Sequence, residues 1–273
     1  MWTSDARALD LLDDAGPFAT QDFREAVTAT VPGWRDVSFG ARARDGTLAA
    51  VPLLAFGRAG ESVPPAGYGC VVSSRPLEPA EVNALLDRLW RESKLRTIRL
   101  RLLGLPDAVQ AGRLVATASA VPVGSLRYAR LARRSMNRAR EAGAIVHDGS
   151  TDMFWSIYEP ASEAWGMTFP EPLLRRLVAV GAARIHAVRT DERPVSVLLT
   201  LVGRSHWMCW LAAQTAEGRR MAASYLAYDA LFAAAKAAGG PYVNLGASVG
   251  DGAEFKHHLG ASRCQCSSGL APP

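Results

Sequence analysis

Three strand-like runs separated by very short turns constrain the fold of this 273-residue chain more than any other feature. They cover residues 184–189, 195–202 and 206–212, and Asp191-Glu192 and Gly203-Arg204 occupy the turns between them. Connections this short join antiparallel strands, whereas parallel strands need a crossover of a dozen or more residues. We therefore expect an antiparallel meander at the centre of the second half of the chain.

Helices and further strands surround this meander in a definite order. The patterns that precede it predict a strand and two helices, at residues 144–147, 152–165 and 172–180. The patterns that follow it predict a long Ala-rich helix, a strand, a short element and a last strand, at residues 221–238, 242–245, 251–261 and 262–266. The first half repeats much of this order, with predicted elements at residues 22–31, 37–43, 48–56, 79–94, 97–103, near Ala108 and at 114–121.

Each half therefore combines an antiparallel meander with helices and a closing strand. A helix–strand pattern of this kind predicts a mixed sheet flanked by helices, in the α/β or α+β class. Asp45-Gly46 between two strand-like runs indicates a hairpin in the first half. The repetition suggests internal duplication into halves at residues 1–127 and 128–273, with the segment 128–143 as the connecting helix.

The composition limits the class of protein. Hydrophobic residues make up 49% of the chain and charged residues 21%, which is ordinary for a globular protein. The net charge of +5 favours anionic partners such as RNA, nucleotides or phosphopantetheine. No secretory signal and no apolar run of roughly 18 residues is visible. Four cysteines are too few for a disulfide scaffold, and Cys264-x-Cys266 lacks a second ligand pair, so we expect a cytoplasmic protein without a metal site.

The pair Phe255-Lys256 is the strongest candidate for chemistry. It lies in Asp251–Ala261, directly after a strand-like run and beside Gly-rich sequence. A lysine at the end of a buried strand can place its ammonium group against developing negative charge. This role requires a protonated lysine, which a partly solvated position would allow. The alternative is an ordinary surface lysine on a short helix.

Three passages carry a resemblance to a known family. They are Gly46–Leu54 with Pro64–Gly69, the basic segment Leu131–Val146, and Asn244-Leu-Gly followed by Glu254–Ala261. In these passages the chain resembles the FemXAB-like aminoacyltransferases, which have two tandem GNAT-like domains. The order of strands and helices in the second half is also the one expected of a GNAT-like fold.

The resemblance implies a reaction as well as a fold. Many relatives take an amino acid from aminoacyl-tRNA and form an amide bond on a peptide amine. By this resemblance Phe255 and Lys256 lie near the reacting ester, and Lys256 steadies the charge of the tetrahedral intermediate. Aminoacyl-tRNA then serves as co-substrate and no cofactor is needed.

The chain departs from the family in the loop of the first half. Cell-wall members tend to have Pro-Arg-Gly-Pro there, where this chain has Pro65-Ala-Gly-Tyr68. The missing arginine argues against a phosphorylated cell-wall precursor. A peptide or a carrier-bound amine in specialised metabolism becomes the expected acceptor, and Tyr68 is included among the candidate substrate-binding residues.

Two groups of arginines could bind phosphates of tRNA or of another substrate. Arg130, Arg134 and Arg138 are spaced at i, i+4, so they share one face of a helix, which could equally be a solvated interdomain helix. Arg219 and Arg220 follow Gly218 at the expected start of the long helix, where the dipole disfavours cations. Such placement hints at an anionic ligand, although exposed arginines are common there.

The segment that begins at Gln214 indicates whether the acyl donor is a coenzyme A thioester. A conventional acetyl-CoA enzyme would have Arg/Gln-x-x-Gly-x-Gly/Ala here, so that backbone amides cradle the pyrophosphate. This chain has Gly218 one residue late and no small residue two positions further on. The sequence therefore argues against a standard CoA site.

Three functions remain open at this point. We expect an aminoacyl-tRNA-dependent aminoacyltransferase, with His257 or His258 as a possible proton relay. An acyl-CoA-dependent N-acyltransferase of the same fold is the first alternative. A non-catalytic module that binds tRNA or peptide is the second.

Overall fold

The computed structural model describes residues 2–11, 16–61, 71–103, 113–166, 168–191, 193–204, 206–247 and 251–270. These residues form two compact units. The first contains the described residues up to 118 together with 203–204 and 264–270, and the second contains those of 119–202 and 206–263. Each unit is described separately below.

The second unit contains the expected meander. Its strands are β11 (Ala183–Thr190), β12 (Arg193–Val202) and β13 (Trp207–Gln214), each antiparallel to the next. Two further strands, β10 (Ala144–Asp148) and β14 (Tyr242–Ala247), complete the sheet order β10-β11-β12-β13-β14. The short turns fix the order of the three central strands, as the sequence predicts.

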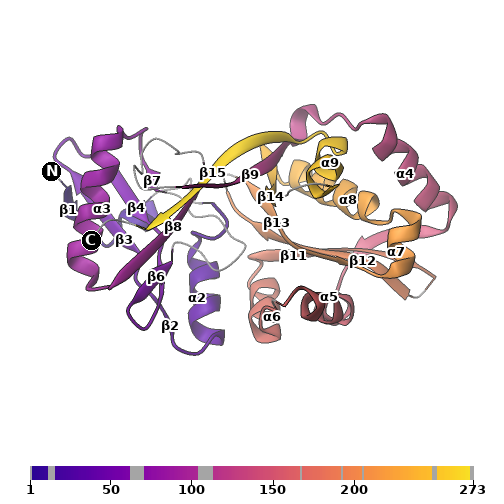
Figure 1. Cartoon of the computed structure of the whole chain (residues 1–273), viewed down its shortest axis with the longest axis horizontal. Helices are drawn as coiled ribbons and strands as arrows, with labels where there is room; N and C mark the ends of the chain where they lie inside the picture. The colour runs from indigo at the N-terminus through magenta and orange to yellow at the C-terminus, as the bar shows by residue number, and fades with distance from the viewer. Residues whose placement is uncertain are drawn as a thin grey trace. The chain divides into compact units, whose positions relative to one another are not determined.

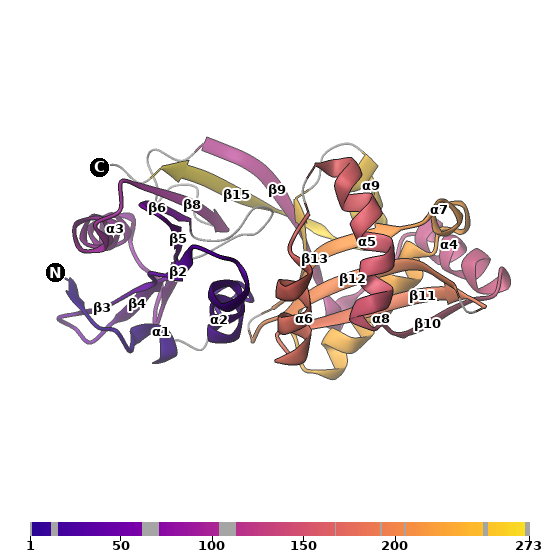
Figure 2. The ribbon, with the colours of Figure 1, turned by 90° about the horizontal axis from the view of Figure 1, so that it is seen from below.

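Helices cover both faces of this sheet (Figures 1 and 2). On one face lie α5 (Thr151–Trp165) and α6 (Glu171–Ala179). On the other lie α4 (Arg130–Glu141), α8 (Ser224–Ala237) and α9 (Asp251–His258). Leu226, Leu231 and Phe232 of α8 are all buried in the core of this unit.

β13 and β14 run parallel, and they are paired over a short stretch only. β13 and β14 are in register only at Trp207–Val243 and Met208–Asn244. Gly246 then adopts a φ of 72°, and its N–H donates to the Asn244 side-chain oxygen at 2.8 Å instead of to a neighbouring strand. Within the described residues, the β14 side of β13 therefore has no strand partner beyond Met208.

The helix predicted over residues 221–238 is present as α8, which begins three residues later than predicted and is preceded by a separate short helix. A six-residue helix, α7 (Ala216–Met221), comes first and ends where Ala222 takes a left-handed φ of 60°. Ser224 then begins α8. Arg219 and Arg220 consequently lie in the last turn of α7, where the helix dipole favours cations, and not at the start of a long helix.

The first unit contains two sheets. One has the order β1-β3-β4-β7, formed by Trp2–Ser4, Phe39–Ala43, Leu48–Val51 and Val72–Ser73. The other contains β15, β8, β6, β5 and β2, formed by Ser262–Leu270, Thr97–Leu103, Ala59–Glu61, Leu54–Phe56 and Trp34–Asp36. The helices of this unit are α1 (Ala8–Leu11), α2 (Gln21–Thr30) and α3 (Pro79–Ser93).

One predicted strand of the first unit is in fact two. The run 48–56 divides into β4, which pairs with β3, and β5, which pairs with β2 and β6 in the other sheet. Pro52 lies at the break, and it has no N–H to donate to a ladder. The Asp45-Gly46 hairpin is confirmed, with Gly46 at a φ of 88°.

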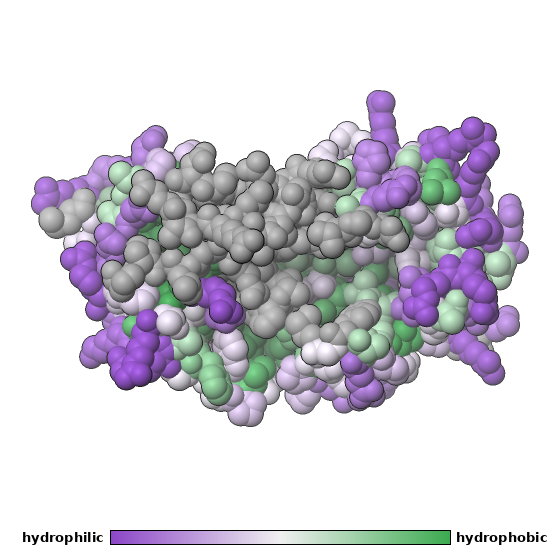
Figure 3. Space-filling view, viewed as in Figure 1, coloured by the Kyte–Doolittle hydropathy of each residue, from purple (hydrophilic) through white to green (hydrophobic). Residues whose placement is uncertain are grey.

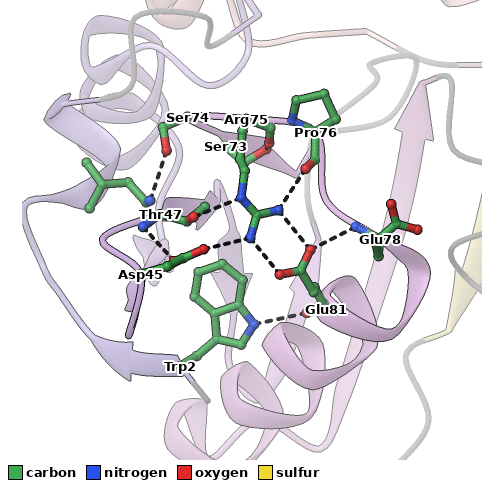
Figure 4. Close-up of polar contacts among 10 residues, drawn as sticks. Trp2, Asp45, Thr47, Ser73, Ser74, Arg75, Pro76, Glu78 and Glu81 are labelled. Atoms are coloured by element: carbon green, nitrogen blue, oxygen red, sulfur yellow. Dashed lines mark hydrogen bonds and ion pairs between the residues drawn. The ribbon is translucent and has the colours of Figure 1, made fainter.

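Arg75 ties this hairpin to helix α3 (Figure 4). Its guanidinium donates to Glu81 with both terminal nitrogens, at 2.9 and 2.8 Å, and to Asp45 at 3.0 Å. The remaining donors reach Thr47 and the Pro76 carbonyl. The hydrogen bonds from Arg75 lower the pKa of Glu81 to about 2. The network orders the loop before α3, whose buried residues are Val82, Leu85, Leu86 and Leu89.

Two strands run from one unit into the other. β9 (Arg113–Pro122) ends in the second unit, where the short 3-10 turn η1 (Val123–Ser125) leads to α4. β15 begins in the second unit, and its later residues pair with β8, from Cys266–Leu103 to Leu270–Arg99. The short helix expected near Ala108 lies outside the described residues. No helix in the described part of the chain is long and apolar enough to cross a membrane.

Candidate active site

A cavity of about 700 Å³ lies in the second unit beside the open part of β13. Ala212, Ala213 and Gln214 of β13 form part of its wall. Residues of α5, β12, α9 and the α7–α8 region form the rest of the wall, so the cavity lies beside the edge of β13 that has no partner on the β14 side. A volume of this size suits a small-molecule group or the end of a larger substrate.

Aromatic rings form one side of this cavity. Phe255 of α9 packs against Tyr225 and Tyr228 of α8, with ring centroids 4.7 and 5.3 Å apart. Phe255 is half-buried, and its packing fixes the start of α9 against α8. Tyr225 and Tyr228 are buried in the core, and they also face the cavity.

Hydroxyl and amide groups gather at another part of the wall. Ser224 Oγ donates to Gln214 Oε1 at 2.7 Å, and Ser196 Oγ lies 3.4 Å from Ser224 Oγ. The three residues meet because Ser196 and Gln214 are cross-strand partners in β12 and β13 and α8 begins at Ser224. Nothing in the local sequence of any one of them indicates this cluster.

Gly218 is held by packing and by a cap. A Cβ added to Gly218 would lie 2.1 Å from the carbonyl oxygen of Val195, so α7 can approach β12 only with glycine here. The Gly218 N–H donates to Thr215 Oγ1 at 3.0 Å, which is the N-cap of α7. The close packing on β12 explains why glycine stands at position 218, and the cap explains how its N–H is satisfied.

Lys256 is buried, contrary to the partly solvated position that the sequence argument required. Only 7% of its surface is exposed, and its Nζ donates to the Gly246 carbonyl oxygen at 2.9 Å. Burial lowers the pKa of Lys256 to about 8, because the apolar surroundings disfavour the charged form. The ammonium is therefore still mainly protonated at neutral pH.

A buried thiol, Cys209, interacts with both this lysine and a tyrosine of the cavity wall. Cys209 Sγ donates to the Tyr228 hydroxyl at 3.4 Å, and Tyr228 borders the cavity. The pKa of the Cys209 thiol is raised by burial, and Lys256 opposes this effect through its positive charge. Lys256 itself is not part of the described cavity wall. Cys209 therefore contacts the cavity-lining Tyr228 and lies within electrostatic range of Lys256.

The two histidines after Lys256 differ in position. His257 is exposed. His258 is half-buried, with Nδ1 3.5 Å from the Tyr225 hydroxyl and Nε2 3.7 Å from a Glu254 oxygen. His258, through Tyr225, is therefore the histidine with a contact toward the cavity.

The arginines of α4 form an exposed basic face. Arg130, Arg134 and Arg138 are exposed, and the opposite side of the helix buries Ala132, Ser135, Met136 and Ala139. Hydrophilic side chains gather in Figure 3 where α4 lies in Figure 1. Among the described residues, these three arginines make no ion pair, whereas Arg140 pairs with Asp229 at 3.2 Å.

The other predicted site residues are dispersed. Arg219 borders the cavity, whereas Arg220 is exposed and is not part of the described cavity wall. Tyr68 lies outside the described residues. In the part of the chain that the structure describes, no three His, Cys, Asp or Glu side chains are grouped to hold a metal ion.

Comparison with known protein families gives a match in the second unit. The family model described as "Acetyltransferase (GNAT) domain" matches residues 123–257, which include α4 to α9 and the whole cavity. This match covers just under half of the chain, and it shows that the region around the cavity is similar to a GNAT domain. No curated protein matches the chain significantly in sequence.

Solved structures extend the likeness to the first unit. The chain is similar to FemX, with a TM-score of 0.71 and 12% identity over 98% of this chain and 96% of that one. It is similar to L-PGS from Bacillus licheniformis, with a TM-score of 0.61 and 12% identity over 97% and 91% of the two chains. It is also similar to a tandem GNAT protein from the clavulanic acid biosynthesis pathway, with a TM-score of 0.56 and 12% identity over 100% and 99%.

These likenesses confirm the tandem GNAT fold that the FemXAB-like resemblance implies. The match to the GNAT family model supports acyl transfer as the class of reaction. At 12% identity, the solved structures carry the fold and leave donor and acceptor to be argued from this chain's own residues.

Proposed function

We propose that this protein is an aminoacyl-tRNA-dependent aminoacyltransferase that forms an amide bond on the amine of a peptide or carrier-bound acceptor. The amine nitrogen attacks the carbonyl carbon of the aminoacyl ester. A C–N bond forms, the bond to the ribose oxygen breaks, and the proton of the amine passes to that oxygen. The ester is already activated, so positioning and charge stabilisation suffice and no cofactor is required.

The environment of Gly218 is the observation that carries the choice of donor. In an acyl-CoA enzyme, the amides at this helix start must be free and the backbone open to a pyrophosphate. Here the Gly218 N–H is used by Thr215, and its Cα lies against the Val195 carbonyl. This arrangement supports a donor other than CoA, and the exposed arginines of α4 offer a surface for the phosphates of tRNA.

Lys256 has an electrostatic role in this proposal. Negative charge develops on the carbonyl oxygen in the tetrahedral intermediate, and a buried positive charge near the cavity stabilises it with little screening by water. With a pKa of about 8, Lys256 supplies that charge at neutral pH. Phe255, which directly precedes Lys256, fixes the position of α9 through its contacts with Tyr225 and Tyr228.

Mass spectrometry of the acceptor distinguishes the three functions. The protein is incubated with small peptides and either a pool of charged tRNAs or acetyl-CoA. The proposal expects a mass increase equal to one amino-acid residue with charged tRNA only. An acetyl increment would establish the CoA-dependent alternative. Salt-sensitive tRNA binding without any product would favour the non-catalytic module.

A further inference from the structure

No described residue of the cavity wall could neutralise a bound cation. Among its described lining residues there is no carboxylate, and Arg219 is the only charged side chain. Most of the remaining wall is alanine, proline, aliphatic or aromatic. A basic side chain entering this space would lose its water, gain no counter-charge and meet the positive charge of Arg219.

The aromatic rings do not replace the missing counter-charge. A cation binds over a ring face. Phe255 stands edge-on to Tyr228, with an interplanar angle of 69°, and is tilted by 56° to Tyr225. The three rings pack mainly on one another, and they do not form an open cage.

The polar part of the wall offers hydrogen-bond donors. Gln214 Oε1 already accepts the Ser224 hydroxyl hydrogen, and Ser224 lies within reach of Ser196. The Nε2 group of Gln214 makes no hydrogen bond to any described residue, and Gln214 borders the cavity. An amide N–H₂ donates two hydrogen bonds, so it recognises an oxygen acceptor such as a carbonyl, amide or hydroxyl oxygen.

We infer that the cavity selects an aminoacyl group whose side chain is uncharged and carries an oxygen acceptor, and that Gln214 is the residue that sets this preference. This inference rests on the proposed function, because it takes the cavity to hold the donor's aminoacyl group. Ser224 and Ser196 position Gln214 by fixing its Oε1. Lysyl and arginyl donors are excluded.

Competition between charged tRNAs tests this specificity. Glutaminyl-, seryl- and lysyl-tRNA are supplied at equal concentration with one acceptor, and the products are counted by mass. The wild type should transfer glutamine or serine at least tenfold faster than lysine. Gln214→Glu adds a carboxylate of nearly the same shape and should shift the lysine-to-glutamine product ratio at least tenfold toward lysine. Gln21→Glu, at an exposed position of α2, is the control and should leave the ratio unchanged.

Binding of amino-acid methyl esters separates this inference from the proposed function. Glutamine and lysine methyl esters carry the same α-amino group, so the difference in their affinities, measured by NMR titration, reports the side chain alone. If no charged tRNA supports transfer, the proposed function fails, and tighter binding of the glutamine ester would still support the selectivity of the cavity. Preferential transfer or binding of lysine by the wild type overturns the inference, as does an unchanged ratio in Gln214→Glu.

Discussion

Gly218→Ala tests whether Gly218 is present for packing. The new Cβ would lie 2.1 Å from the Val195 carbonyl oxygen, and an ordinary contact needs 3.4 Å, so α7 must move by about 1.3 Å. That shift disturbs the Thr215 N–H bond to the same carbonyl, now 3.0 Å. Overpacking costs about 1–3 kcal/mol and a lost hydrogen bond about 1 kcal/mol, while replacing glycine returns about 0.4–1 kcal/mol.

The expected result is a loss of roughly 2 kcal/mol of unfolding free energy, or a fall of about 4–8 °C in Tm. Denaturation followed by circular dichroism measures it. Gly124→Ala is the matched control, because nothing lies within 4 Å of the added Cβ and its φ is not positive, so its stability should stay within about 0.5 kcal/mol. An unchanged Tm for Gly218→Ala, accompanied by loss of CoA binding, would refute the packing argument and restore a CoA site.

Two further perturbations test the lysine and the basic helix. Lys256→Met should change how stability depends on pH. The pKa of Lys256 is about 8 in the folded protein and 10.5 ordinarily, so between these pH values the folded wild type binds fewer protons than the unfolded chain. The free energy of unfolding of the wild type should therefore rise by roughly 3 kcal/mol relative to the variant as pH rises from 8 to 10.5. Chemical denaturation of both proteins at several pH values measures this, and a constant difference would contradict the burial of the charge. Arg134→Glu with Arg138→Glu should weaken tRNA binding and reduce its log–log salt slope by about 2, since each arginine that contacts a phosphate contributes about 1. The control is Arg91→Glu with Arg176→Glu, which changes the net charge equally at two exposed arginines on α3 and α6. An equal loss of tRNA affinity in this control would show that only net charge matters.

Some of the structure follows directly from local sequence. The meander of β11, β12 and β13 is predictable because its turns are too short for any other pairing. The basic face of α4 follows from the spacing of Arg130, Arg134 and Arg138. Pro52 indicates the break between β4 and β5, because a proline has no N–H to donate to a neighbouring strand.

Other features depend on contacts distant in sequence. Alanine has high helix propensity, so nothing local indicates that Ala222 ends α7; the packing of Gly218 on the Val195 carbonyl sets the direction of α7 before that turn. The burial of Lys256 is equally hard to predict, because its partner, Gly246, belongs to β14 and lies ten residues earlier in the sequence. Gln214, Ser196 and Ser224 meet only through the register of β12 with β13 and the start of α8.

The pH dependence of catalysis by Lys256→Met tests the central claim most directly. Single-turnover transfer from charged tRNA is measured for wild type and variant from pH 6.5 to 9.5, and the ratio of the two rates cancels the ionisation of the acceptor amine. Lys236→Met, at an exposed lysine of α8, is the control and should give a ratio of one. We predict a ratio of about 10 at pH 7, because a buried charge outside the cavity wall acts on the intermediate only through the low-dielectric interior, and a fall toward one by pH 9 as Lys256 loses its proton. A ratio near one at pH 7, or one that does not change with pH, would contradict the electrostatic role of Lys256.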